Sequence, residues 1–225
     1  MNLRQSLRTA LIVTCSLTLY IGSSHAETYS DAEAIPNDSA FWAFLMSPEH
    51  TKYAGAIAAQ EDARIGFSCT EDARYLPVIL KLLTPVTIQT GDVQPTAGQW
   101  VERFTVEACG KSRIYNALFT VDDDGGLLVL PVVPGHSARH FALLRDLRPQ
   151  MEAVANIENC AAKTVYDTYV GLPGGYEGKV EGGEYETWFI LGCGQRVALV
   201  LTFEPAEDAQ VVVSVEKQLT IQNQQ

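Results

Sequence analysis

The chain has 225 residues, and its 27 acidic and 16 basic side chains give a formal net charge of −11 at pH 7. A chain with this charge repels nucleic acid and anionic lipid headgroups, so we expect no nucleic-acid partner. The length is sufficient for one medium-sized domain or for two small domains that share a core.

The first 26 residues have the organisation of a secretory signal peptide. Arg4 and Arg8 precede an apolar stretch from Ala10 to Ile21, and small residues lead to Ala26, after which we expect cleavage. The apolar stretch is shorter than the roughly 20 residues that span a bilayer, so we expect no membrane span. Cleavage removes two arginines and no acidic residue, which changes the net charge from −11 to −13. These features predict a soluble protein of the bacterial periplasm, or a secreted one.

The second half of the sequence repeats the first. Residues 98–131 align without a gap on residues 182–215, and the matched pairs are Glu102 with Glu186, Phe104 with Trp188, Val106 with Ile190, Cys109 with Cys193 and Phe119 with Phe203. An even number of cysteines in an exported chain favours disulfides over metal ligation. Because equivalent units should pair their cysteines alike, we predict the bonds Cys69–Cys109 and Cys160–Cys193. Each bond would stabilise the fold by about 4 kcal/mol in the chain-entropy account.

The first unit is predicted to begin with helices and to continue with strands. Asp38 or Ser39 can cap a short helix over residues 41–46, and Ser47 with Pro48 starts a second helix that continues toward Asp62. Pro77 disfavours a helix in the apolar stretch 75–83 and fits an edge strand. Further strands are predicted at residues 86–88, 99–107, 113–121 and 127–133, with a hairpin turn at residues 122–126.

The second unit is predicted to have the same order of elements. Ser137 is expected to cap an amphipathic helix that is interrupted at Pro149. Strands are then predicted at residues 165–170, 185–191, 196–203 and 210–215. The fold class is therefore α+β, with two tandem repeats that each contain a leading helix, an antiparallel meander and one disulfide. The predicted divisions are a signal peptide (1–26), a flexible leader (27–37), repeat unit 1 (38–134), repeat unit 2 (135–217) and a polar tail (218–225).

Two groups of residues have some of the features of a metal site. His136 and His140 have the four-residue spacing of zinc-binding histidines, but the adjacent Glu of a zinc-protease helix is absent, and Pro134-Gly135 places His136 before the helix. Residues 122–124 are three aspartates, but the ligand alternation of a calcium loop is missing. We therefore predict surface histidines, a solvated hairpin turn, no bound metal and no cofactor.

The glycine-rich stretch from Gly171 to Gly183 is a candidate partner-binding loop. It has no phosphate-loop signature, since Val180 follows Gly178-Lys179 where Ser or Thr would be needed. A long hairpin connection is one interpretation, and a mobile recognition loop that presents Tyr176, Glu177 and Lys179 is the other.

Catalytic signatures are missing from the sequence. The sequence contains no nucleophile elbow and no recognisable catalytic Ser–His pair. Glu102 and Glu186 occupy equivalent positions in the two units. The two carboxylates of a glycosidase instead have different roles in one cleft, so this pair does not fit that chemistry. We expect each to pair locally with a basic residue such as Arg113.

The sequence thus favours an exported, non-enzymatic binding or assembly module. Its expected partner is another exported protein, which the acidic charge would suit if that protein is cationic. Two alternatives stay open, namely an acidic inhibitor of a cationic exported enzyme and an enzyme with an unrecognised site. The sequence does not determine the oligomeric state.

Overall fold

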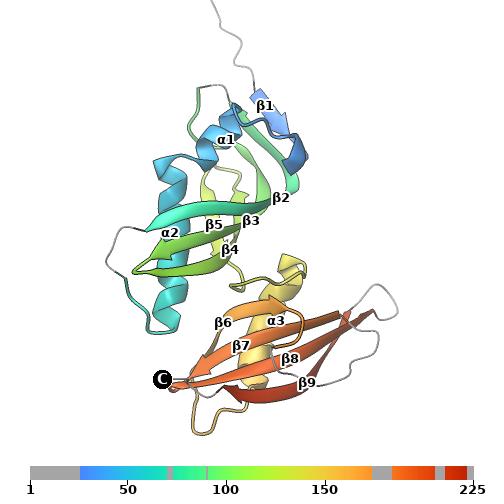
Figure 1. The fold of residues 1–225 in the computed structure, drawn as a ribbon. Coiled ribbons are helices and arrows are strands. Elements are labelled where there is room, and N and C mark those ends of the chain that lie inside the picture. Colours follow the sequence, from blue (N-terminus) through green and yellow to red (C-terminus); the bar gives the residue numbers. More distant parts are fainter. Residues whose placement is uncertain (1–25, 70–72, 90, 174–183, 206–210, 222–225) are drawn as a thin grey trace, which may run out of the picture.

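The fold contains two antiparallel sheets (Figure 1). The computed structural model describes residues 26–69, 73–89, 91–173, 184–205 and 211–221. The first sheet has the order β1 (Ala26–Tyr29), β2 (Arg74–Gln89), β3 (Ala97–Ala108), β4 (Lys111–Val121) and β5 (Leu127–Pro131). The second has the order β6 (Lys163–Val170), β7 (Glu184–Gly192), β8 (Gln195–Pro205) and β9 (Val211–Ile221). The predicted α+β class is confirmed.

The first sheet packs its inner face against two helices, α1 (Ala40–Leu45) and α2 (Pro48–Arg64). Ser39 caps α1 and Ser47 caps α2, each with its side chain accepting a backbone N–H three residues later. Alternate residues of β3 and β4 point to this face, which is the period-2 pattern of a half-buried strand. The core of this unit is largely aromatic, and its fully buried rings include Phe41, Trp100, Phe104, Tyr115 and Phe119.

The second sheet packs against α3 (Phe141–Val154). We expected Ser137 to cap this helix and Pro149 to interrupt it, and both expectations are wrong. His140 caps the helix, and the helix continues through Pro149 to Val154. The proline removes one backbone hydrogen bond, but the buried face that includes Leu144 and Met151 holds the helix on the sheet.

Two segments differ in detail from the sequence expectations. The residues for which a flexible leader is expected include residues 27–29 of β1, which pairs with residues 86–89 of β2, and the short 3-10 helix η1 (Ala32–Ala34). The two strands expected at residues 75–83 and 86–88 form one long strand, β2. Register shifts after Pro77, Leu82 and Thr84 let this strand bend along β3.

Both predicted disulfides are present. Cys69 bonds Cys109 and Cys160 bonds Cys193. In each case the second cysteine lies in a two-residue Cys-Gly hairpin turn, and both turn residues have positive φ. Such turns match the twist of the flanking strands. Each disulfide therefore fixes the tip of a hairpin to the segment that precedes β2 or β6.

Glu102 is fully buried in the aromatic core of the first unit, so the expected pairing with Arg113 is wrong. Its Oε2 lies 2.9 Å from Nε2 of His50, which is also fully buried at the start of α2. Burial raises the pKa of Glu102, and only the hydrogen bond and charge of His50 oppose that shift. The other carboxylate oxygen, Oε1, has no hydrogen-bond partner among the described residues.

Glu186 is also fully buried, but the second unit satisfies it with several donors. The hydroxyl of Ser137 donates to both carboxylate oxygens, at 3.0 and 2.8 Å. The backbone N–H of Ala138 and the indole N–H of Trp188 add bonds of 2.9 and 3.0 Å, and Arg139 lies at 3.3 Å as an ion pair. The side chain that we expected to cap α3 therefore binds a buried carboxylate.

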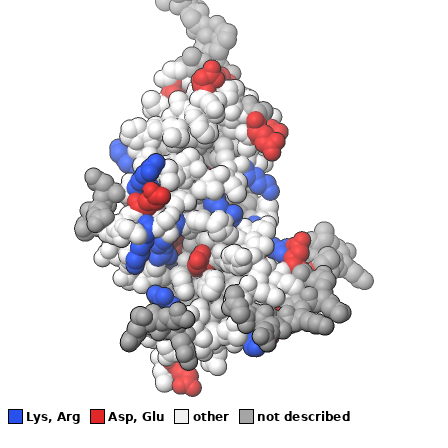
Figure 2. All heavy atoms as spheres, in the orientation of Figure 1, with Lys and Arg blue, Asp and Glu red and all other residues white. Residues whose placement is uncertain are grey.

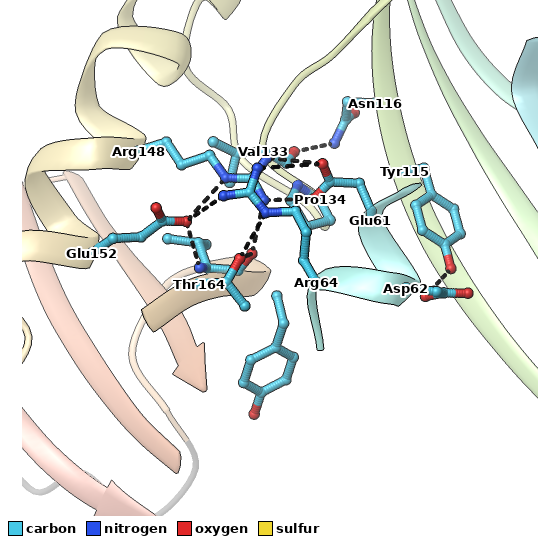
Figure 3. Close-up of polar contacts among 12 residues, drawn as sticks. Glu61, Asp62, Arg64, Tyr115, Asn116, Val133, Pro134, Arg148, Glu152 and Thr164 are labelled. Carbon is cyan, nitrogen blue, oxygen red and sulfur yellow. Dashed lines mark hydrogen bonds and ion pairs between the residues drawn. The ribbon is translucent and has the colours of Figure 1, made fainter. Parts of the chain in front are cut away.

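A polar junction connects the two units (Figure 3). The guanidinium of Arg148 in α3 binds both carboxylate oxygens of Glu61 in α2, and its Nε donates to Glu152 at 3.2 Å. Arg64 of α2 reaches Glu152 and, at 3.2 Å, the hydroxyl of Thr164 in β6. Because Glu61 and Arg148 are both buried, their charges stabilise the fold only as a pair.

The segment between β5 and α3 adds backbone bonds to the same junction. The amide of Gly135 donates to Ile114 of β4, and the amide of His136 donates to Thr168 of β6. The side chain of Asn116 donates to the carbonyls of Val133 and Gly135. A Cβ at Gly135 would lie 2.3 Å from Thr168 N, so only glycine fits here. The linker therefore joins β4 to β6 and holds the sheets together.

The described helices include none that is long and apolar enough to cross a membrane.

The two buried glutamates predict unequal effects of the same substitution. Glu186→Gln places an amide NH₂ among donors, so we expect a loss of about 2–3 kcal/mol in the free energy of unfolding. Glu102→Gln keeps an acceptor for His50 and removes a carboxyl group whose ionised form burial disfavours, so we expect a loss of about 1 kcal/mol or less. Urea unfolding of the disulfide-intact proteins at neutral pH measures both. Equal losses would contradict this account of the two cores.

The junction predicts a recovery in a double variant. Arg148→Met leaves Glu61 buried with Arg64, at 4.0 Å, as its remaining ion-pair partner, so we expect a loss of about 3–5 kcal/mol. Adding Glu61→Gln removes that charge and should recover at least half of the loss. Urea unfolding provides the measurement, and Lys52→Met at the exposed pair with Glu49 is the matched control, with an expected change below about 0.5 kcal/mol. No recovery in the double variant would show that the ion pair is not the main interaction at the junction.

Candidate functional site

A polar cleft lies between the two sheets and is lined by residues of both units. Its volume is about 440 Å³, within the range of small-molecule sites. The first unit contributes the segment that follows α2 and the start of β4, and the second unit contributes β6 and the start of β8. The lining residues on which the site's chemistry depends are Phe67, Lys111, Arg113, His136, Tyr166, Asp167 and Arg196.

The two disulfide-linked hairpin turns position the basic side chains that line this cleft. Lys111 and Arg113 follow the Cys109-Gly110 turn, and Arg196 follows the equivalent turn at Cys193-Gly194. The Cys69–Cys109 bond ties the first turn to the segment after α2, which contains Phe67. The ammonium of Lys111 lies over the ring of Phe67, 4.4 Å from its centroid. Local backbone geometry and the disulfides therefore fix the positions of these charges.

Arg113 is the best-anchored cation of the cleft. One terminal nitrogen lies 3.2 Å from a carboxylate oxygen of Asp62, and the other donates to the backbone carbonyl of Tyr166 at 3.2 Å. Asp62 also accepts a hydrogen bond of 2.7 Å from Tyr115, whose pKa is raised by burial and by that bond. Arg113 thus crosses the gap between the units with a partner on each side.

Lys111 and Arg196 have no carboxylate partner among the described residues. Both contact aromatic rings, and Arg196 lies 5.7 Å from the centroid of Tyr166. Desolvation raises the pKa of this tyrosine, and the charge of Arg196 opposes the shift. Two cations without counter-ions beside a third that is paired give the cleft an excess of positive charge, in a protein whose net charge is strongly negative.

Asp167 is the acidic group of the cleft. Its backbone neighbour Thr168 donates an N–H to Oδ1 at 2.9 Å. Burial raises the pKa of Asp167, and the hydrogen bond from Thr168 and the charges of Arg113 and His136 oppose that shift. The protonation state of this one carboxyl group therefore changes the net charge that a ligand in the cleft would meet.

The cleft continues into a neighbouring hollow. A second cavity of about 370 Å³ shares Ile65 and Leu191 with the first, and it adds Arg64 and Lys163 to the lining. Figure 2 shows basic side chains gathered on the left of this face, at the level where the β3–β4 turn approaches the second sheet. Positive charge is therefore concentrated along the boundary between the units.

The structure separates the two histidines that were considered as metal ligands. His136 lines the inter-sheet cleft, whereas His140 caps α3 and lines a different groove. Among the residues that the structure describes, no group of three or more His, Cys, Asp or Glu side chains could hold a metal ion. The three aspartates at residues 122–124 lie in the β4–β5 turn, where Asp122 accepts N–H bonds from Asp124 and Gly126.

The partner-binding residues proposed from sequence, Tyr176, Glu177 and Lys179, lie outside the described residues. Sequence reasoning missed the cationic cleft because its residues come from segments far apart in the chain. One signal was available: each Cys-Gly turn is followed within three residues by a basic side chain, in the sequences CGKSR (109–113) and CGQR (193–196). Two such turns would be expected to present charge together if the hairpin tips lay close to each other.

Comparisons with protein-family models, with curated proteins and with solved structures found no match. The chemistry of the cleft therefore has to be inferred from its own residues.

Proposed function

We propose that this protein is an exported, non-enzymatic binding module that captures a small anionic ligand in the cleft between its two sheets. The observation that carries the proposal is the convergence of Lys111, Arg113 and Arg196 on one cavity of about 440 Å³. Two of them, Lys111 and Arg196, have no counter-ion in the part of the chain that the structure describes. Charge-assisted hydrogen bonds from arginine and lysine are the strongest protein contacts to carboxylate, sulfate or phosphate groups.

The acidic remainder of the protein limits the size of that ligand. A net charge of −11 for the full chain repels extended polyanions, so nucleic acid is a poor candidate. A ligand small enough to lie within the cleft meets the local positive charge while its other parts stay away from the acidic surface. We therefore expect selectivity for compact anions with one or two charges.

We further propose that the two units are copies of one ancestral unit. In each unit a helix is followed by a cysteine, a four-stranded meander and a disulfide to the second hairpin turn. Glu102 and Glu186 are both buried, as are Phe104 and Trp188. The two units contribute different side chains to the cleft, and boundaries between such units are frequent positions of ligand-binding sites.

Export to the bacterial periplasm is the proposed setting. The predicted signal peptide supports it, with its two arginines, its apolar stretch and the small residues before Glu27. The two disulfides also support it, because disulfides persist in oxidising compartments.

The first test of this function uses sulfate as the probe. We expect sulfate to bind with one-to-one stoichiometry in isothermal titration calorimetry, and the double variant Lys111→Gln/Arg196→Gln to weaken binding at least about tenfold. Both side chains are exposed, so the fold should be retained. The control is Arg145→Gln, which changes an exposed arginine outside the cleft. Equal affinity in the double variant, or no sulfate binding at low ionic strength, would refute the proposed site.

The second test concerns pH. Because the pKa of Asp167 is raised, its protonation as the pH falls through that pKa removes a negative charge from the cleft, so sulfate should bind more tightly in acid. We expect Asp167→Asn to bind sulfate more tightly near neutral pH and to flatten the pH profile. Sulfate itself is fully ionised in mild acid, and a His136→Gln background removes the imidazole that also lines the cavity. An unchanged slope in Asp167→Asn would show that this carboxyl group does not control binding.

A further inference from the structure

A third cavity, of about 400 Å³, lies on the opposite face of the first sheet from α2, where the start of α3 approaches β2 and β3. We call it the β2–α3 groove. Its lining is mostly aliphatic or aromatic and includes Ile79, Leu83, Val101, Val132, Phe141 and Leu144. The β2–α3 groove and the inter-sheet cleft both lie near the linker between β5 and α3, but they have no lining residue in common.

The groove also contains positive charge without a carboxylate partner. Lys81 lines it and makes no ion pair with a described residue. Arg103 is half-buried, and it donates only to neutral groups, the side-chain oxygen of Asn116 at 2.9 Å and the carbonyl of Ser137 at 2.7 Å. Burial lowers the pKa of this guanidinium, and the nearby charge of Glu186 opposes that shift. Arg103 forms no direct ion pair with a described residue, so an anion in the groove would give this half-buried cation a partner.

These observations define the chemistry of a ligand. The apolar lining would take up a hydrocarbon chain, with a gain of about 0.8 kcal/mol for each buried methylene group. Lys81 and Arg103 would bind an anionic head, and Arg139 contributes less because it already pairs with Glu184 and Glu186. The volume is at the lower end of the range for small-molecule sites, which suits a single short chain.

The neighbouring strand edge is a poor template for a peptide. Among the described residues, β1 pairs only with residues 86–89 of β2, which leaves the first part of β2 as an open edge. That edge contains Pro77 and register shifts after Pro77 and Leu82. Proline lacks an N–H, and bulges interrupt the ladder that an added strand would continue. These features favour a small amphiphile over an extended peptide segment.

We propose that the β2–α3 groove binds a single-chain amphiphile with an anionic head, such as a medium-chain carboxylate. Lys81 and Arg103 hold the carboxylate, and the side chains around Val101 and Phe141 enclose the chain. This site is independent of the anion cleft, so either proposal can fail without the other.

Decanoate below its micellar concentration is the probe, and the affinity is measured by isothermal titration calorimetry on the full mature protein. We expect one-to-one binding that Lys81→Gln weakens about tenfold and that Ile79→Glu weakens at least as much. Ile79 is 52% exposed, so its substitution should leave the fold intact. The matched controls are Lys52→Gln and Val93→Glu, which change an exposed lysine and an exposed apolar residue elsewhere and should leave the affinity unchanged.

Three comparisons decide between the alternatives. Acetate and decyltrimethylammonium should each bind far more weakly than decanoate, because the first lacks the chain and the second lacks the anionic head. Equal binding of either would overturn the proposal. Loss of decanoate binding in Lys111→Gln/Arg196→Gln would place the ligand in the cleft and would also overturn it. Finally, an acidic aliphatic peptide that binds in a Lys81-dependent manner while decanoate does not would assign the groove to a protein partner.

Discussion

The buried ion pair between Arg148 and Glu61 is the interaction on which the relative position of the two units depends. A single charge in this environment would be strongly disfavoured, so each residue requires the other, and the two-point geometry of a guanidinium on a carboxylate fixes distance and orientation together. Glu152 and Arg64 extend the pair toward β6. The inter-sheet cleft has walls from both units, and its shape is therefore set by this junction and by the linker bonds at Gly135.

The two cores solve one problem in different ways. Both bury a glutamate on the seventh residue pair from the turn of the central hairpin. The second unit surrounds Glu186 with a hydroxyl, a backbone amide, an indole and a guanidinium. In the first unit, His50 is the one side chain among the described residues that binds the carboxylate of Glu102. Four buried polar atoms of that core lack a partner among the described residues, namely His50 Nδ1, Tyr75 OH, Trp100 Nε1 and Glu102 Oε1. Such atoms cost free energy on folding, so the first unit depends more heavily on its aromatic packing.

Extensive aromatic packing in the first unit offsets the free-energy cost of these buried polar atoms. Trp100 and Phe119 stack with ring centroids 5.1 Å apart, and Phe119 stacks in turn on the ring of His50 at 5.2 Å. Phe41 and Phe44 approach the same tryptophan edge-on. Pairs in these geometries add about 0.5–1.5 kcal/mol each beyond their buried area. A rigid core beneath β3 and β4 also steadies the Cys109-Gly110 turn, which presents two of the cleft's cations.

Local sequence signals determined the class of the fold and its covalent links. Alternating apolar residues specified the strands around Cys109 and Cys193, the Ser caps specified the starts of α1 and α2, and the cysteine spacing within a repeated pattern specified both disulfides. These features depend on neighbours within a few residues or on the similarity between the two halves of the sequence, and both are visible in a single chain. The start of α3 was predicted wrongly because the hydroxyl of Ser137 binds the buried carboxylate of Glu186 and does not cap the helix.

Only the tertiary structure decided where charge would gather. Lys111, Arg113 and Arg196 come from two hairpins that the sequence places more than 80 residues apart, and the cavity that they share exists because Arg148 and Glu61 dock the units. The burial of His50 beside Glu102 was equally invisible, because a helical histidine and a strand glutamate separated by 52 residues have no local pattern in common. Periodicity and caps report on one element at a time. The pairing of buried charges depends on which elements meet, and that is fixed only when the two sheets and their helices pack together.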